Sequence, residues 1–173
     1  ASVQEAAERV ERLYPLSLAS EGSCTVGGNL ATNAGGVQVI RYGNARDLCL
    51  GVEAVMADGS VFHGLRRVRK DNAGYDLRHL LIGSAGTPGV ITAASLRLFP
   101  RPEQTVAAFL GMSGPDAALR FMALASERLG PVLSAFELIH RTGLDFLTET
   151  MPQVRQPLAA PPEWMVLLEA GGP

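Results

Sequence analysis

The sequence is almost without lysine. Fourteen of its fifteen basic residues are arginine, and Lys70 is the single exception. A Walker-type phosphate loop needs a Gly-Lys pair, which this sequence does not contain. The net charge is only −2, so the chain has no overall field that would attract nucleic acid. We therefore expect no nucleic-acid partner. Lys70 is the single candidate for a catalytic lysine.

Long apolar runs are also absent. No stretch of about 18 apolar residues occurs, which is the length that a membrane-spanning helix needs. Residues 1–10 carry Glu5 and Glu8 instead of the basic and apolar segments of a signal peptide. With only two cysteines, the chain is no disulfide scaffold. We expect Cys24 and Cys49 to be free thiols in a reducing, cytoplasmic compartment.

Histidine is scarce as well. His63, His79 and His140 are 16 and 61 residues apart, and such separations are not those of metal ligands. We expect His63 and His79 to lie on the surface, and we expect no metal site. Spacing also yields no Ser/His/Asp or Cys/His pair, so the catalytic residues stay unknown.

Proline and glycine are unevenly distributed along the chain. Proline occurs twice before residue 100 and nine times from there on, whereas thirteen of the nineteen glycines lie between Gly22 and Gly89. Pro100 and Pro102 mark a stretch that disfavours both a helix and a central strand. We therefore expect one domain over residues 1–100 and a second over residues 101–173.

Periodicity and turn residues predict helices and strands in both parts, which makes the fold class α+β. Asp58-Gly59 between two apolar runs is a strong signal for a hairpin. The predicted elements are a helix ending before Pro15, the hairpin over 50–64, and strands over 90–98, 105–111, 132–139 and 164–169, with helices over 115–129 and 142–150. The last strand should leave an unpaired edge near Val166 and Leu168, which favours a homo-oligomer.

The densest motif is the glycine-rich segment from Gly22 to Gly43. Two Gly-Gly pairs flank a run of small residues, and Leu30 is the only bulky side chain between Asn29 and Gly36. Such a segment lets a ligand approach the main chain, whose N–H groups can point at its oxygen atoms. A tight glycine turn packed by small residues is the equally weighted alternative.

A second motif runs from Gly83 to Thr92. Three glycines, Gly83, Gly86 and Gly89, occur at intervals of three before a β-branched segment, so backbone is again exposed. The dinucleotide fingerprint requires a strand, a turn and then a helix, whereas here the turn precedes a strand. This order argues against a Rossmann site.

Six short motifs follow one another along the chain: Gly27-Gly28-Asn29, Ala31 to Gly36, Arg41-Tyr42-Gly43, Leu50 to Glu53, Lys70 to Leu77, and Gly86 to Thr92. In this combination the sequence resembles the FAD-linked oxidoreductases of the vanillyl-alcohol-oxidase superfamily. It resembles most the branch that oxidises D-2-hydroxy acids such as D-lactate, glycolate or D-2-hydroxyglutarate. The resemblance covers essentially the whole chain, more tightly before Pro102 than after it.

The resemblance implies a partial enzyme with FAD as cofactor. Residues 1–100 would be the second half of a two-part FAD-binding domain, and residues 101–173 the start of a ferredoxin-like substrate (cap) domain. The implied function is FAD-dependent oxidation of a small D-2-hydroxy acid as part of a larger enzyme, with an unknown electron acceptor. The alternative is a catalytically inactive fragment or subunit module that needs a partner to complete the flavin site.

The resemblance also implies which residues contact the cofactor. Ala85 and Pro88 depart from the family pattern, which usually has Glu and Leu at these two positions. Both changes should weaken the binding of FAD by this loop. Arg41 and Tyr42 could face the active site, although a salt bridge and a packed ring are equally plausible. The implied cofactor-binding residues are Gly27, Gly28, Asn33, Gly35, Gly36, Gly86, Gly89, Ile91 and Thr92.

Overall fold

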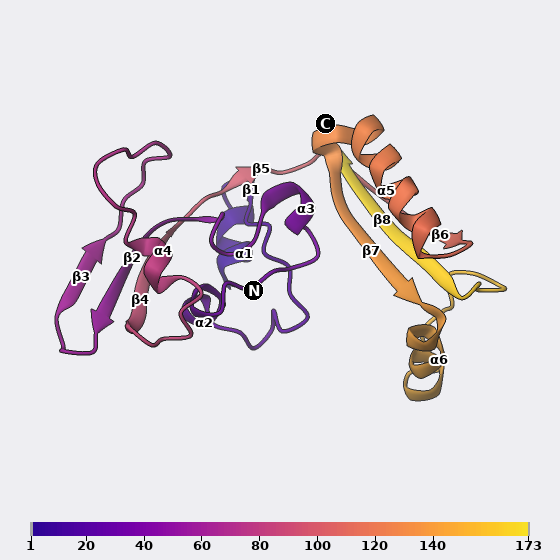
Figure 1. Ribbon diagram of the computed structural model, residues 1–173, viewed down its shortest axis with the longest axis horizontal. Helices are drawn as coiled ribbons and strands as arrows, with labels where there is room; N and C mark the ends of the chain where they lie inside the picture. The colour runs from indigo at the N-terminus through magenta and orange to yellow at the C-terminus, as the bar shows by residue number, and fades with distance from the viewer. Residues whose placement is uncertain (1, 173) are drawn as a thin grey trace. The chain divides into compact units, whose positions relative to one another are not determined.

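The computed structural model describes residues 2–172, which form short helices and antiparallel sheets (Figure 1). The fold is α+β, so the prediction of the fold class is confirmed. The chain divides into two compact units, Ala1–Arg101 (unit 1) and Pro102–Pro173 (unit 2). Each unit contains a three-stranded antiparallel sheet of its own.

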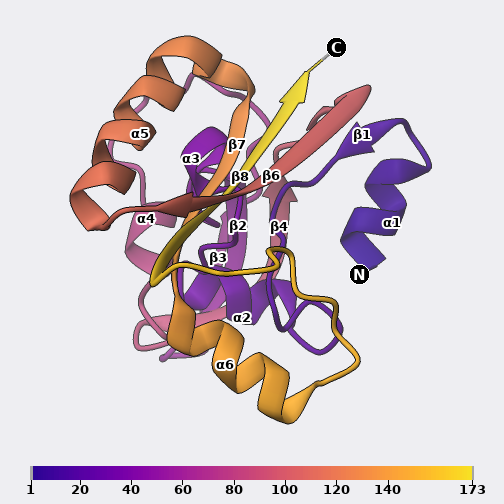
Figure 2. The ribbon, with the colours of Figure 1, turned by 90° about the vertical axis from the view of Figure 1, so that its right-hand side faces the viewer.

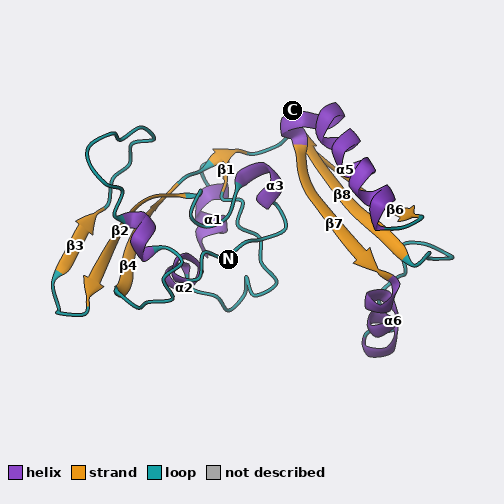
Figure 3. Ribbon diagram, viewed as in Figure 1, coloured by secondary structure: helices purple, strands orange, loops and turns teal. Residues whose placement is uncertain are grey.

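Unit 1 contains a three-stranded sheet with the order β3-β2-β4 and a two-stranded sheet of β1 and β5. Long loops separate its elements (Figure 3). These elements are, in chain order, α1 (Ser2–Glu8), β1 (Arg12–Leu13), α2 (Val26–Ala31), α3 (Val39–Tyr42), β2 (Cys49–Met56), β3 (Val61–Gly64), α4 (Arg78–Leu81), β4 (Gly89–Leu96) and β5 (Phe99–Pro100).

The first helix is shorter than its apolar periodicity predicts. It ends at Glu8, and Glu11 then takes a left-handed φ of 55°. Arg12 and Leu13 instead pair with Pro100 and Phe99. Pairing with a strand almost ninety residues away thus outweighs the local helical pattern, because such a pairing is invisible in a short sequence window.

The predicted hairpin is confirmed, with β2 and β3 antiparallel. Gly59 takes a φ of 83°, and the Asp58 carboxylate accepts hydrogen bonds from both the backbone N–H and the hydroxyl of Ser60. On β2, the buried Val52 and Ala54 flank the half-buried Glu53. One face of the sheet therefore lies on the core and the other faces outward.

The core of unit 1 gathers residues from α1, α2, β2 and the end of α4. Leu30, Leu48 and Val52 are completely buried, and Ile82 is almost so. Burial of an aliphatic side chain of this size contributes about 1.5–3 kcal/mol. Leu30 is the one bulky residue of the small-residue run, and it anchors α2 to this core.

Unit 2 has the predicted strand-helix-strand-helix-strand order. Helix α5 lies along its sheet and α6 follows the end of β7 (Figure 2). The Phe121 ring of α5 packs on Phe136 of β7 at 5.8 Å between ring centroids. The elements are β6 (Gln104–Met112), α5 (Pro115–Leu129), a 3₁₀ turn (Gly130–Val132), β7 (Leu133–His140), α6 (Arg141–Thr150) and β8 (Trp164–Gly172).

The predicted edge near Val166 and Leu168 is wrong. Strand order is β6-β8-β7, so β8 is the central strand. Val166 lies opposite Leu110 of β6 and Leu138 of β7, and it is completely buried. The last strand along the chain inserts between the other two, so the unpaired edges belong to β6 and β7. Across residues 2–172 the helices are all too short or too polar to cross a bilayer.

Candidate functional site

The two glycine-rich motifs lie side by side in unit 1. Helix α2 packs against β4, and a Cβ added at Gly27 would lie 3.1 Å from the carbonyl oxygen of Ile91. The turn before β4 is bonded to the end of α2, because Gly83 N–H donates to Leu30 O at 2.9 Å and Ala85 N–H to Ala31 O at 2.8 Å. Segments that are fifty residues apart in sequence thus form one surface.

Helix α2 is fixed by its own polar residues. The Thr25 hydroxyl caps it by accepting from Gly28 N–H at 3.1 Å. Beyond its end, Asn33 takes a left-handed φ of 49°, and its side-chain oxygen accepts from Arg46 N–H at 3.0 Å. The Asn33 side chain therefore holds the loop that follows, a role that spacing in the sequence does not indicate.

Three of the predicted cofactor-binding glycines are packed tightly by the chain itself. A Cβ at Gly36 would overlap the carbonyl oxygen of Ser17, and one at Gly89 would lie 2.5 Å from that of Val55. Gly27 is confined less tightly, by the backbone oxygen of Ile91 at 3.1 Å from its added Cβ. At these positions the absence of a side chain serves the fold, which favours the packed-turn interpretation for them.

The other predicted glycines are exposed. A Cβ at Gly35 would meet only the tip of Val39 at 3.5 Å, and one at Gly86 would have no neighbour nearer than 4.0 Å. Gly86 has a φ of 83°, so glycine is also favoured by its backbone. Gly28 is exposed, with only the capping hydroxyl of Thr25 at 3.0 Å. These three positions leave main chain open to a ligand.

Ile91 and Thr92 of β4 point to different environments. Ile91 lies opposite Ala54 and packs against the core. Thr92 is the extra residue of a β-bulge between the pairs made by Ile91 and Ala93. The bulge brings its hydroxyl to Glu53 on β2, with 3.0 Å between the two oxygens.

The outer face of this sheet carries a short chain of polar contacts that the sequence analysis missed. Glu53 accepts from Thr92 with one carboxylate oxygen, and its other oxygen lies 3.2 Å from His63 Nδ1. Glu53 and His63 are directly opposite each other on β2 and β3. The alternation of β2 could have placed Glu53 on this face, but the bulge that adds Thr92 has no signature in the sequence.

Arg46 links the end of α2 to the turn before β4. Its guanidinium donates to the carbonyl oxygens of His79 at 2.8 Å and Ile82 at 2.5 Å. Gly83 follows directly, and a Cβ there would lie 2.9 Å from the Arg46 Nη2 atom. Arg46 is a positioning residue that the sequence analysis missed, because its partners are more than thirty residues away.

The two departures from the family pattern lie in the turn before β4. Ala85 has a left-handed φ of 53°, a conformation that costs a residue with a Cβ some free energy. Pro88 lines an apolar pocket of about 330 Å³ together with residues from β2, β3 and α4. The turn is thus held by the backbone bond of Ala85 to Ala31 and not by a charged side chain at position 85.

Arg41 and Tyr42 are part of an aromatic contact. Tyr42 is buried, and its ring meets that of Phe99 edge-on with 4.8 Å between centroids. The Arg41 guanidinium lies 5.0 Å from the centroid of the Tyr42 ring. Of the two interpretations of Tyr42, the structure therefore supports the packed ring.

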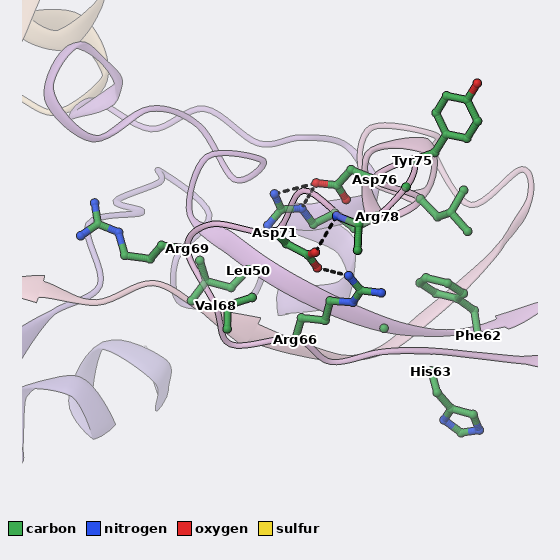
Figure 4. Close-up of a pocket in the computed structure, with 14 residues that line it drawn as sticks. Leu50, Phe62, His63, Arg66, Val68, Arg69, Asp71, Tyr75, Asp76 and Arg78 are labelled. Carbon is green, nitrogen blue, oxygen red and sulfur yellow. Dashed lines mark hydrogen bonds and ion pairs between the residues drawn. The ribbon is translucent and has the colours of Figure 1, made fainter.

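A charged pocket of about 170 Å³ lies between β2, β3 and the loop over residues 65–77 (Figure 4). Arg78 donates through Nε to Asp76 at 2.9 Å and through Nη1 to Cys49 O at 2.5 Å. Arg66 forms an ion pair with Asp71. These two arginines are each balanced by an aspartate, Arg69 also lines the pocket, and Tyr75 is almost fully exposed.

Both cysteines are free thiols, as expected. Burial raises the pKa of the Cys49 thiol, which donates a hydrogen bond to Gly51 O. A buried, protonated thiol is a poor nucleophile.

His63 and His79 are exposed, as predicted. Across residues 2–172 no three His, Cys, Asp or Glu side chains gather as metal ligands would.

Comparison with known proteins supports FAD as the cofactor. Residues 1–64 match the model of an FAD binding domain. The chain is 39% identical to mitochondrial D-2-hydroxyglutarate dehydrogenase of Arabidopsis thaliana and 42% identical to that of Danio rerio, over 92% and 95% of its length. The alignments span 29% and 31% of those proteins, so the chain spans about a third of the length of the curated relatives it matches.

The fold itself also occurs in a solved structure. Alkyldihydroxyacetonephosphate synthase superposes on 99% of this chain with a TM-score of 0.72 at 21% identity, and the match covers 34% of that protein.

The expected cytoplasmic location is wrong, because the D-2-hydroxyglutarate dehydrogenases that this chain matches are named as mitochondrial. Free thiols do not distinguish the two compartments, and composition alone could not have corrected this expectation.

Proposed function

We propose that unit 1 supplies one part of a flavin-binding domain and unit 2 the start of a substrate domain. The reason is that this chain belongs to the FAD-linked oxidoreductases of the vanillyl-alcohol-oxidase superfamily. FAD is the cofactor. The observation that carries the proposal is the junction of α2, the turn before β4 and β4 itself, which joins both glycine-rich motifs in one surface.

The residues of this surface fit FAD. Gly28, Gly35 and Gly86 leave exposed main chain that a flat or extended polar group can approach closely. Gly27, Gly36 and Gly89 fit a different role, because their own backbone neighbours fill the space. We therefore assign cofactor contact to the first three glycines, and a positioning role to the second three together with Asn33 and Ile91.

The proposed activity of the whole protein is oxidation of a small D-2-hydroxy acid, and D-2-hydroxyglutarate is the favoured substrate because the relatives are named for it. When bound, FAD supplies the two-electron acceptor for the hydride of the substrate carbon. Unit 1 binds and orients the cofactor through backbone and short polar groups. The groups that move the substrate proton are sought in the two thirds of the relatives' length that this chain does not match.

A second candidate is a module without activity of its own. The chain spans about a third of the relatives' length, so the remaining contacts that a dinucleotide needs come from other residues. In that case a partner polypeptide supplies the rest of the flavin site.

A chimaera distinguishes the proposals. The matching 164 residues of the Danio rerio enzyme are replaced by this chain, and the purified protein is measured for flavin-to-protein ratio and for dye reduction with D-2-hydroxyglutarate. We expect stoichiometric flavin and turnover. A folded chimaera without flavin would refute the role of unit 1. Flavin without turnover on D-2-hydroxyglutarate, but with turnover on D-lactate or glycolate, would refute only the favoured substrate.

The chimaera also tests the assignment of the glycines. Gly35→Val is expected to reduce flavin content while the melting temperature changes little, because a Cβ there meets only the tip of Val39. Gly89→Val is the matched control and is expected to lower the melting temperature first, since its Cβ would press on Val55. Unchanged flavin in the folded Gly35 variant would refute its contact with the cofactor.

A further inference from the structure

The side chain of His79, on α4, lies between two charged groups. Its Nδ1 atom is 3.1 Å from Nη1 of Arg46, and its Nε2 atom is 3.3 Å from a carboxylate oxygen of Asp76. A guanidinium group has only donors, so Nδ1 accepts this hydrogen bond and the ring proton lies on Nε2. The Asp76 carboxylate accepts from Nε2, so both neighbours stabilise the same neutral tautomer of His79.

Arg46 extends this contact to the turn before β4. The guanidinium that donates to the His79 ring also donates to the carbonyl oxygens of His79 and Ile82. The backbone N–H of Arg46 donates to the Asn33 side chain, just after α2. Gly83 follows Ile82, and its N–H is bonded to the end of α2. The His79 ring is thus connected, through one arginine, to both sides of the junction between α2 and this turn.

A proton can add to the His79 ring only at Nδ1, because Nε2 already carries one. Nδ1 faces Arg46, which stays charged, so protonation replaces a hydrogen bond by a contact between two cations. The Asp76 carboxylate lies at the opposite nitrogen and is itself held by Arg78 at 2.8 Å (Figure 4). Because Asp76 retains the imidazolium on its side, Arg46 is the group that has to move.

The elements around His79 supply no further charge to relieve this contact. Helix α4 packs against β2, whose single charged residue, Glu53, is bonded to His63 and Thr92 on the outer face. Helix α2 and strand β4 contain no charged residue. Within residues 2–172, the charged side chains bonded to the His79 ring are therefore Arg46 and Asp76.

We propose that neutral His79 is a positioning residue that holds Arg46 on the turn before β4, and that a proton on His79 releases this turn. Histidine side chains change charge between about pH 5 and pH 8, so the release occurs in that range. The turn carries Gly86, to which we assign cofactor contact, so the consequence for FAD rests on the function proposed above. Flavin binding then weakens toward the acid end of the range.

Amide exchange of the whole chain, followed by NMR, tests the release without any cofactor. The amides of Gly83 and Ala85 donate to α2. Their protection factors should fall by about tenfold from about pH 8 to about pH 5, since a like-charge contact near a protein surface costs about this factor. His79→Asn keeps an acceptor for Arg46 that takes up no proton, so protection should stay high throughout. His79→Lys places a cation there permanently, so protection should be low throughout.

The matched control is His63→Asn, which removes another exposed histidine that lies beside a carboxylate, that of Glu53. It should leave the pH effect at Gly83 and Ala85 unchanged. Circular dichroism establishes that each variant is folded. Wild-type protection that does not vary with pH would overturn the proposal. So would a pH effect that His79→Asn retains or that His63→Asn abolishes, or high protection in His79→Lys.

The chimaera with the Danio rerio enzyme measures the consequence for the cofactor. Its Kd for FAD should rise by about tenfold over the same pH range, and His79→Asn should remove most of this rise. An equal rise in both proteins would refute the link between His79 and flavin binding. A folded chimaera without flavin, together with the expected exchange results, would refute the proposed function and support the positioning role of His79.

Discussion

Adjacent glycines of the candidate site differ in what they do. Gly36 lies so close to Ser17 that the chain itself excludes a side chain, whereas its neighbour Gly35 meets only the flexible tip of Val39. A glycine-rich motif thus mixes positions that the fold needs with positions that a ligand could use. Sequence alone does not separate them, because the residue that fills the space at Gly36 is nineteen positions away.

A pair of alanine variants separates the two roles. Gly36→Ala should lower the free energy of unfolding by about 2 kcal/mol or more, because the backbone of Ser17 has to shift. Gly35→Ala should change it by less than about 0.5 kcal/mol. Urea denaturation measures both. Equal effects would mean that the close approach to Ser17 does not determine stability.

Tyr14 gives a prediction about alkaline pH. Burial, with smaller contributions from Cys49 and Cys24, raises its pKa to about 12 from an ordinary value near 10. The native state therefore keeps the phenol proton that the unfolded state loses above about pH 10. This contribution to stability is complete below pH 10 and is lost as the pH rises to about 12, with a total of about 2–3 kcal/mol.

The measurement is denaturant unfolding between pH 9 and pH 12. Tyr14→Phe should remove this component of the pH dependence, since phenylalanine carries no titrating group. Tyr75→Phe is the control, because it removes the same hydroxyl from a tyrosine that is 95% exposed. A wild-type curve parallel to that of Tyr14→Phe would refute the raised pKa.

At the scale of elements, the sequence predicts correctly those helices and strands that depend on nearby residues, and it does not predict those that depend on distant ones. The hairpin was predictable because Asp58-Gly59 carries its own turn, and α5 because its apolar residues recur at helical spacing. The early end of α1 depends on pairing of Arg12 with Pro100, and the central place of β8 depends on two partner strands at once. Neither dependence is visible in a window of ten or fifteen residues.

The candidate site shows the same difference between local and distant signals. The glycine motifs were recognisable as exposed backbone, but the contacts that join them were not. Arg46 reaches α4 across more than thirty residues, and Thr92 meets Glu53 only because a bulge turns its side chain. Positioning by a distant side chain or by a bulge has no local pattern, so these residues emerge only from the fold.

Arg46 should therefore matter for the turn before β4. Arg46→Ala is expected to lower the free energy of unfolding by about 2–3 kcal/mol, because it removes charged donors from the carbonyl oxygens of His79 and Ile82. Hydrogen exchange at Gly83 should accelerate. Arg67→Ala is the control and should have an effect below about 0.5 kcal/mol, since Arg67 is exposed. Unchanged exchange at Gly83 would contradict the positioning role.

At the scale of the whole molecule, the chain offers only part of a flavin site. Its match to the FAD binding domain covers residues 1–64, and it spans about a third of its relatives. Each missing hydrogen bond to a charged oxygen of the dinucleotide forfeits roughly 1.5–3 kcal/mol. We expect the isolated chain to bind FAD with a Kd weaker than about 1 μM. Calorimetric titration tests this expectation, and a sub-micromolar constant would contradict it.

The central place of β8 also governs when unit 2 can fold during synthesis. Strands β6 and β7 do not pair with each other, so neither has a partner strand until residues 164–172 have left the ribosome. At the usual pace of translation, the residues up to Gly172 take roughly 3–12 s to be added after Met112. The two-stranded sheet of unit 1 also forms late, because Phe99 and Pro100 must be synthesised before they can pair with Arg12 and Leu13. An apolar strand that waits this long in the cell is a natural substrate for nascent-chain chaperones.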